Sequence, residues 1–392
     1  MHIFRQSIQQ LLIRSNIIIV GVGQTVLVTK NHIPKTNMKF IRGLQLVCVP
    51  LLLTTFATRS DASFISSLSP SSSSSSSTSK CEETSPNAAD TCGEGNDNAV
   101  VDIKTMLKTT KPDQYNQVHP IETKDLIDTS ITQLDDVVSN VLDDGVKSGL
   151  KMAQQKCPEF VNSKEHKLMF LRSELFDVQP AAERYAKYWN KRIELFGEEK
   201  ACKPILSLND ALQDDESALN VGFIKLLDGV TDDRGRALMW IDPANLDSTK
   251  YSRESMVRAV WYIMHAALES ETAQQKGLVF LVYIGNNPAL SVFDRPLISM
   301  VAESISYLIP LRAGAIHLFP TPLVFSVLLN IIKYVLGSRL RNTLKVTGGS
   351  NDKILDTLNK LGVTKDVLPI EVGGKVDHDH DAWLAKRRKE GK

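Results

Sequence analysis

The sequence predicts an α/β protein built on a mostly parallel β-sheet with flanking helices. Strand-like and helix-like segments alternate through residues 236–361, which is typical of strands joined by right-handed helical crossovers. Residues 278–284 form an unbroken apolar run, as expected for a central strand that is covered on both faces. Residues 315–374 add two more strands and a helix so apolar that it needs cover on nearly every side.

A helical region is expected before the sheet. Apolar residues recur at spacings of three and four within residues 129–155, which predicts one amphipathic helix. Residues 164–174 and 180–196 predict two more helices, the second opened by a proline that suits a first helical turn. A short helix is also expected at 206–212.

Four strands and four helices are then expected to alternate. A turn signal at 232–235 precedes the first strand. The strands are expected at residues 236–242, 277–285, 315–319 and 342–347. The helices are expected at residues 253–269, 296–308, 322–336 and 352–361.

The helix expected at 322–336 carries the strongest functional signal. Ten of its side chains are apolar. Its length of roughly 22 Å is too short for a bilayer core of about 30 Å. Exposing such side chains to water would forgo on the order of 1.5–3 kcal/mol each, so the cover must come from core, partner, ligand or membrane surface.

Composition and motifs argue against several other classes of function. The 392 residues carry a formal net charge of +1, which gives nucleic-acid binding no electrostatic support. The glycines at 21 and 23 lack the third glycine of a dinucleotide site, and no Gly-x-Ser-x-Gly elbow is present. His378 and His380 lie in a polar tail and are expected to be solvent-exposed rather than metal ligands. We therefore expect no catalysis, no metal and no cofactor.

The first quarter of the chain is expected to direct targeting. Read from Met38, a basic start is followed by an apolar centre at 44–56 and small residues at 60–62, which is a signal-peptide pattern. A short signal anchor or an upstream extension from a wrong start codon are the alternatives. The Ser-rich stretch that follows is expected to be disordered, and it resembles the presequences of complex plastids. Entry into the secretory pathway, with a plastid as a further destination, is predicted; the alternative is a cytoplasmic peripheral membrane protein.

The five cysteines show no CxxC pair and no metal-like spacing. Cys48 would leave with the signal peptide. If the chain enters the secretory route, Cys81 and Cys92 could pair, although free thiols in a linker are an equal alternative.

Five phrases, in the right order, resemble the CRAL-TRIO family, the lipid-exchange domain of phosphatidylinositol and phosphatidylcholine transfer proteins and of tocopherol and retinal carriers. They lie at residues 170–178, 233–236, 240–243, 314–325 and 368–374. The resemblance implies a CRAL-TRIO fold, with a sheet floor and a mobile hydrophobic gate helix that enclose one lipid, preceded by an all-helical N-terminal subdomain. It covers residues 164–374, with 322–336 as the gate.

The expected domains follow from these observations. They are a targeting region at 1–63, a Ser-rich linker at 64–99, a helical lead-in at 100–228, the lipid-binding domain at 229–374 and a polar, basic tail at 375–392. The expected function is binding and transfer of one hydrophobic ligand by a monomer that docks on membrane surfaces. The alternative is a non-catalytic interaction module that docks a partner or membrane through the gate helix.

The candidate site residues come from the strands and the gate helix. Which strand parity faces the cavity is a guess, because alternation sets only the parity. The expected ligand-binding residues are Trp240, Phe280, Val282, Ile316, Leu318, Phe325, Leu328, Leu329 and Ile332. The cations just beyond the gate are expected to meet anionic headgroups, and a solvated edge is the alternative. These cations are Arg339, Arg341 and Lys345.

Departures from the family argue against an inositol lipid. The resemblance places small hydroxyl residues, a Glu and a Lys at positions that correspond to Leu278, Phe280, Leu311 and Thr343. All four lack the hydroxyl or charge that an inositol phosphate would need. The family's Asp is replaced by Tyr283. Another phospholipid, a sterol-like or isoprenoid molecule, or a pigment-like one is therefore the expected ligand.

Overall fold

The computed structural model describes residues 17–19, 26–28, 103–285, 293–321 and 326–392. The chain divides into two units, 1–94 and 95–392. In the first, β1 (Ile17–Ile19) pairs antiparallel with β2 (Val26–Val28). The expected signal peptide, the Ser-rich linker and Cys48, Cys81 and Cys92 lie outside the described residues.

The second unit is built around one five-stranded sheet. Its strands are β3 (Ile224–Thr231), β4 (Ala237–Ile241), β5 (Leu278–Tyr283), β6 (Ala313–Phe319) and β7 (Leu344–Val346), side by side in that order. The pair β3–β4 is antiparallel and the other three pairs are parallel. The expected α/β fold with a mostly parallel sheet is confirmed.

The antiparallel strand β3 was not predicted. Its sequence has an Asp-Gly pair in its second half and no clear alternation, so the pattern that marks strands is missing. β3 begins at Ile224, so the domain boundary expected between 228 and 229 falls inside a strand. The sheet domain therefore starts before the expected boundary.

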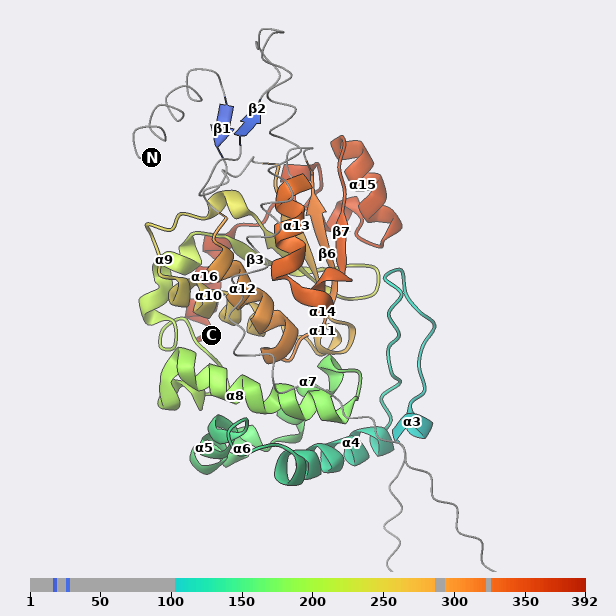
Figure 1. Ribbon diagram of the computed structural model, residues 1–392, viewed down its shortest axis with the longest axis vertical. Helices are drawn as coiled ribbons and strands as arrows, with labels where there is room; N and C mark the ends of the chain where they lie inside the picture. The colour runs from blue at the N-terminus through green and yellow to red at the C-terminus, as the bar shows by residue number, and fades with distance from the viewer. Residues whose placement is uncertain (1–16, 20–25, 29–102, 286–292, 322–325) are drawn as a thin grey trace, which may run out of the picture. The chain divides into compact units, whose positions relative to one another are not determined.

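Helices cover both faces of the sheet (Figure 1). On one face lie α8 (Val178–Ala201), α10 (Arg253–Ala267) and α12 (Arg295–Glu303), whose buried side chains share a core with Met239, Phe280 and Ile316. On the other lies α15 (Asn351–Lys360), where Ile354 and Leu358 pack with Val279 and Leu281. The unbroken apolar run of β5 is thus buried on both sides, as the sequence predicts.

The expected helix at 129–155 is two helices. α4 (Lys124–Asp136) continues into a π-helical turn (Val137–Val141), and α5 (Ser148–Lys156) follows after a break. The break contains Asp-Asp-Gly, which favours a turn. The buried Lys147 stabilises it, because its Nζ donates to the carbonyls of Val138 and Ser139 at 2.8 and 2.9 Å.

The remaining helices of the lead-in are α3 (Ile103–Met106), α6 (Pro158–Val161) and α7 (Lys164–Ser173). The prediction of a helix at 206–212 was wrong, because these residues form turns. A 3₁₀ turn (Gln213–Asp215) and α9 (Glu216–Asn220) follow them. The expected helix at 296–308 is α12 followed by a π-helical turn (Ser304–Leu308). α11 (Glu271–Lys276) was not predicted.

The expected polar tail is a docked helix, α16 (His380–Lys389). Trp383 and Leu384 are buried, and the Arg387 guanidinium bonds both carboxylate oxygens of Glu269 at 2.6 and 2.9 Å. His380 is also buried, with its Nε2 3.0 Å from the carbonyl of Leu219. The expectation that this histidine is exposed to solvent was wrong, because Trp383 and Leu384 pack the tail against the domain.

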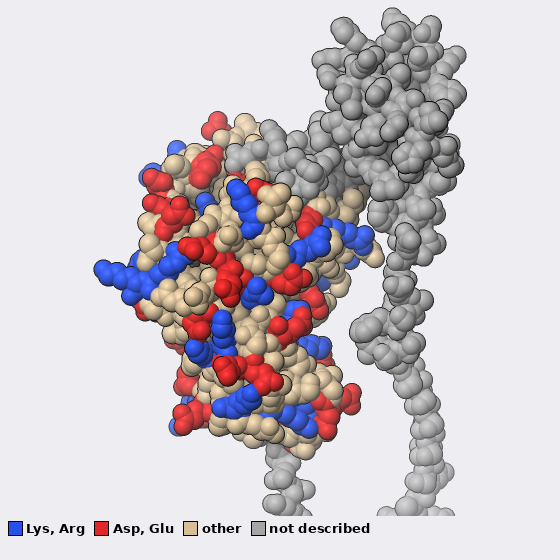
Figure 2. Space-filling view, turned by 90° about the vertical axis from the view of Figure 1, so that its left-hand side faces the viewer, with Lys and Arg blue, Asp and Glu red and all other residues tan. Residues whose placement is uncertain are grey.

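The surface of the second unit mixes both signs of charge. Figure 2 shows basic and acidic side chains interspersed over one face of the protein, in keeping with the near-zero net charge. None of the helices in the described part of the chain is long and apolar enough to cross a membrane.

Candidate ligand site between the sheet and helix α13

One face of the sheet brings together four of the expected ligand-binding side chains. In the parallel pair β5–β6, Phe280 lies beside Ile316 and Val282 beside Leu318. Alternation then places all four on the same face. This face is the one that also carries α8, α10 and α12.

Helix α13 (Ser326–Val335) lies over the carboxyl ends of the same strands. Leu329 and Ile332 pack against a small cluster formed by Ile284 and Leu318, together with Val282 and Leu344. Six of the nine expected residues therefore meet on one side of the sheet. Phe325 and the side chain of Leu328 lie outside the described residues.

Trp240 lies on the opposite face, so its assignment to the same cavity was wrong. In the register of β4 and β5 it is the neighbour of Leu281, whereas Met239 is the neighbour of Phe280. Its ring stacks on Tyr283 at 5.1 Å between centroids, on the side of the sheet that α15 covers. Sequence alternation cannot give the register between strands, and a one-residue shift exchanges the two faces.

Helix α13 is apolar but incompletely covered. Leu329, Ile331, Ile332 and Val335 are all only half-buried. Tyr334 is 65% exposed, and the guanidinium of Arg295 lies 5.6 Å from the centre of its ring. Apolar side chains left half-covered on an otherwise well-packed protein typically mark a binding or membrane-contact surface.

The three expected membrane cations do not share one surface. Arg339, in α14 (Gly337–Arg341), forms an ion pair with the buried Glu174. Arg341 is exposed. Lys345 is the register partner of His317, so it lies on the face opposite to α13. Arg339 and Arg341 are both exposed and lie in α14, next to α13, whereas Lys345 is not on that side of the sheet.

A charged cavity of about 210 Å³ lies beside α14. Arg184, 3% exposed, donates from Nε to Glu174 Oε1 at 2.6 Å, and Arg339 pairs with the other oxygen of this carboxylate. Leu311 and Thr343, two of the positions that depart from the family pattern, also line it. Its charged lining does not suit a hydrocarbon chain.

A second polar cavity, of about 230 Å³, lies on the other side of Arg312. It is lined by Glu122, Arg172 and Lys276, among others. Burial lowers the pKa of Arg312, which lines both cavities, to about 10. Each cavity is smaller than the usual range of about 300–1,000 Å³ for ligand pockets.

His317, in the middle of β6, is a buried and neutral side chain. Its Nε2 lies 2.9 Å from the Tyr115 hydroxyl, and the residue is fully buried. Burial, and next the charge of Lys345, lower its pKa to about 4. The segment that supplies Tyr115 carried no clear sequence pattern, so this contact was not predicted.

His317 should therefore make the protein less stable in acid. Between about pH 6.5 and 4 the histidine takes up a proton in the unfolded chain but stays neutral in the folded one, so the free energy of unfolding falls as the pH falls. His317→Gln should make this dependence shallower by about 1.4 kcal/mol per pH unit. Urea unfolding at pH 6.5, 5.5 and 4.5 measures this pH dependence for the wild type and the variant. The same change in the free energy of unfolding with pH in both proteins would contradict the prediction.

The comparisons with known proteins agree with the motifs. The CRAL/TRIO domain family model matches residues 222–374. Clavesin-1 of Xenopus laevis is 26% identical over 222 residues, which cover 55% of this chain and 62% of that protein. An alpha-tocopherol transfer protein-like protein of Mus musculus is 28% identical over 224 residues, covering 56% of this chain and 60% of that protein.

This chain thus spans somewhat less than two thirds of the length of these relatives. The solved structure titled "Crystal structure of Sfh5" aligns with a TM-score of 0.42 and 12% identity, over 69% of this chain and 100% of that chain. That likeness is too low to support an argument. The family model and the curated relatives together identify residues 222–374 of this chain as a CRAL/TRIO domain.

Proposed function

We propose that this chain binds one hydrophobic ligand between the sheet face of Phe280, Val282, Ile316 and Leu318 and helix α13, and transfers it between membranes without catalysis. The observation that carries the proposal is the incomplete burial of the apolar side chains of α13. Its apolar side chains from 329 to 335 are half-buried or exposed, although they face a sheet with apolar residues of its own. An apolar ligand on the inner side and a membrane surface on the outer side would complete the cover.

Release of the ligand would then be coupled to membrane contact. Moving α13 away from Leu318 and Ile284 exposes apolar surface in water, at a cost on the order of several kcal/mol. A membrane surface offsets this cost because the same side chains enter the acyl boundary. The exposed Arg341 and Tyr334 at this end suit contact with anionic headgroups.

The proposed ligand is a lipid other than phosphatidylinositol. Leu278 and Leu311 are fully buried apolar side chains at positions where the family resemblance places polar groups. The Thr343 hydroxyl donates to the carbonyl of Leu340 at 2.8 Å, so its proton is already engaged in a hydrogen bond within the protein rather than with a ligand. Another phospholipid, a sterol-like or isoprenoid molecule, or a pigment-like one fits these positions better.

The mass of the bound molecule is the direct test. We expect native mass spectrometry of the full chain to show one copurifying hydrophobic molecule per monomer, and extraction to release it in a form that exchanges into liposomes. If no molecule copurifies and none is taken up from liposomes of mixed lipid composition, the chain is not a transfer protein. A filled apolar interior would then favour the alternative, an interaction module that docks a partner through α13.

A further inference from the structure

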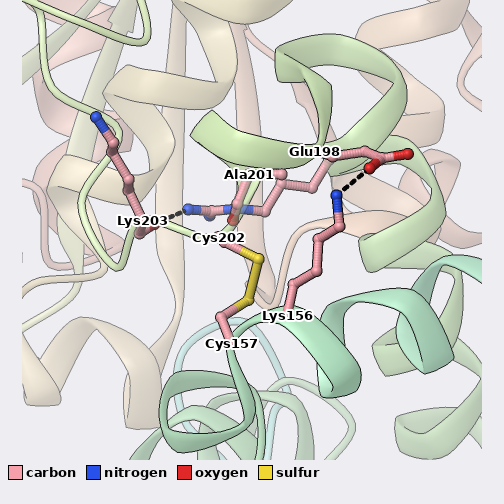
Figure 3. The surroundings of a disulfide bond; sticks show 7 residues. Lys156, Cys157, Glu198, Ala201, Cys202 and Lys203 are labelled. Carbon is pink, nitrogen blue, oxygen red and sulfur yellow. Dashed lines mark hydrogen bonds and ion pairs between the residues drawn. A yellow bond between two sulfur atoms is a disulfide. The ribbon is translucent and has the colours of Figure 1, made fainter.

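Two of the five cysteines are joined within the helical lead-in. Cys157 and Cys202 form a disulfide, with their Cα atoms 5.7 Å apart and a sequence separation of 45. Cys157 lies at the junction of α5 and α6, and Cys202 directly follows α8. Figure 3 shows the bond crossing between these helices, with the Lys156–Glu198 ion pair beside it. This pair was not predicted from the sequence, in which Cys81 and Cys92 were the expected candidates for a disulfide.

The disulfide fixes one end of α5 to α8, and hydrogen bonds fix the other end. Near the start of α5, the backbone N–H of Gly149 donates to Asn190 Oδ1 at 2.7 Å, and the Asn190 amide donates to the carbonyl of Val146 at 2.8 Å. A Cβ on Gly149 would lie 2.5 Å from Asn190 Oδ1, so only glycine allows this approach. The disulfide holds the other end of the same helix.

Buried groups hold the backbone on both sides of Cys202. Arg192, 1% exposed, donates from Nε to the carbonyl of Ala201 at 2.8 Å and from Nη2 to that of Lys203. Its guanidinium lies 5.6 Å from the ring centre of Phe160, in the helix that Cys157 opens. Buried contacts therefore hold the backbone next to both cysteines of the disulfide, as in a structural cross-link rather than a catalytic thiol pair.

We propose that this chain folds and works in an oxidising compartment, where Cys157–Cys202 is a permanent structural cross-link. Disulfides form and persist in the secretory lumen and in secreted proteins, whereas cytosolic thiols are kept reduced. The signal-peptide pattern that begins at Met38 is a separate observation, in another part of the chain, that points to the same route.

Formation of the bond needs an oxidant of that compartment. The two thiols lose two protons and two electrons, and the disulfide of a thiol–disulfide oxidoreductase accepts them and becomes a dithiol. Exchange passes through a mixed disulfide with one of the two cysteines. Both cysteines are half-buried, so the exchange has to take place before the helices have fully packed.

The compartment is tested by trapping thiols in the cells from which the chain comes. Cells are quenched in acid, free thiols of the full chain are blocked with a maleimide, and the blocked cysteines are identified by peptide mass spectrometry. We expect Cys157 and Cys202 to react only after treatment with a reductant. Reaction of both at the quench, without reductant, would overturn the proposal.

The structural role is tested by melting temperature. Closing a loop of this size should raise the melting temperature by on the order of 5–15 °C, so reduction of the purified full chain with dithiothreitol should lower it by that amount. Cys157→Ser, Cys202→Ser and the double variant should show the same loss, because each removes the same bond. Cys81→Ser/Cys92→Ser is the matched control, and reduction should lower its melting temperature as it does that of the wild type. An unchanged melting temperature on reduction would contradict a structural role, and this measurement needs no variant to fold.

Discussion

Replacing Leu329 and Ile332 together with Asp should abolish lipid transfer by the full chain. Both side chains pack from α13 onto Leu318 and Ile284, so two carboxylates there would be placed against apolar surface with no partner. The helix would then be held away from the sheet, and the ligand would lose its cover. We expect transfer between donor and acceptor liposomes to fall at least 10-fold, and no ligand to copurify.

Asn330→Asp is the matched control for this variant. It adds a carboxylate to the same helix at an exposed position, so the ligand should stay bound and transfer should change little. The double variant must also keep its secondary structure, which circular dichroism reports. A folded double variant that transfers lipid as fast as the Asn330→Asp control would rule out α13 as the cover of the site.

The sequence predicted the parallel part of the sheet because the signal there is local. Two of its strands, β4 and β5, are continuous apolar runs, and β6 is apolar apart from His317. The elements between these strands have helical periodicity. β3 carries neither signal. Its place depends on backbone pairing with β4 at Ile224–Ile241 and on cover from α10, both of which are tertiary contacts.

The candidate site was predicted in part for the same reason. Alternation within β5 and β6 correctly grouped Phe280 with Val282 and Ile316 with Leu318. It could not place Trp240, because the face of β4 depends on its register against β5. It could not pair Cys157 with Cys202 either. These two residues come together only because α5 packs on α8 after the break in the chain at residues 142–147.

A buried charge network at the start of β4 was also not predicted from the sequence. Arg236 is fully buried, and its Nη1 donates to Asp232 at 3.0 Å while Nη2 bonds to Asp113. Asp113 comes from a segment before α4, and Tyr115 of that segment lies under the guanidinium, with its ring centre 5.0 Å away. The segment thus fastens the N-terminal part of the second unit to the sheet.

Asp232 holds this network in place. Its side chain is fully buried, and besides the ion pair its Oδ1 accepts from the backbone N–H groups of Arg234 and Arg236 at 3.0 and 2.8 Å. These bonds shape the turn that leads into β4. The carboxylate therefore supports both the charge of a buried guanidinium and the backbone of a central element.

Asp232→Ala should lower the free energy of unfolding by about 3–5 kcal/mol, because it leaves a buried guanidinium with one carboxylate instead of two and two backbone donors without an acceptor. Asp232→Asn keeps an oxygen for the backbone donors and should lose less. Asp366→Ala is the matched control, since this carboxylate is 68% exposed and pairs with Lys375 at 2.5 Å, where a loss of at most about 1 kcal/mol is expected. Urea unfolding at pH 7 compares the three variants with the wild type. If Asp232→Ala and Asp366→Ala lower the free energy of unfolding by similar amounts, Asp232 does not hold the network. If the loss is largest for Asp232→Ala, smaller for Asp232→Asn and smallest for Asp366→Ala, the charge of Asp232 and its backbone hydrogen bonds make separate contributions.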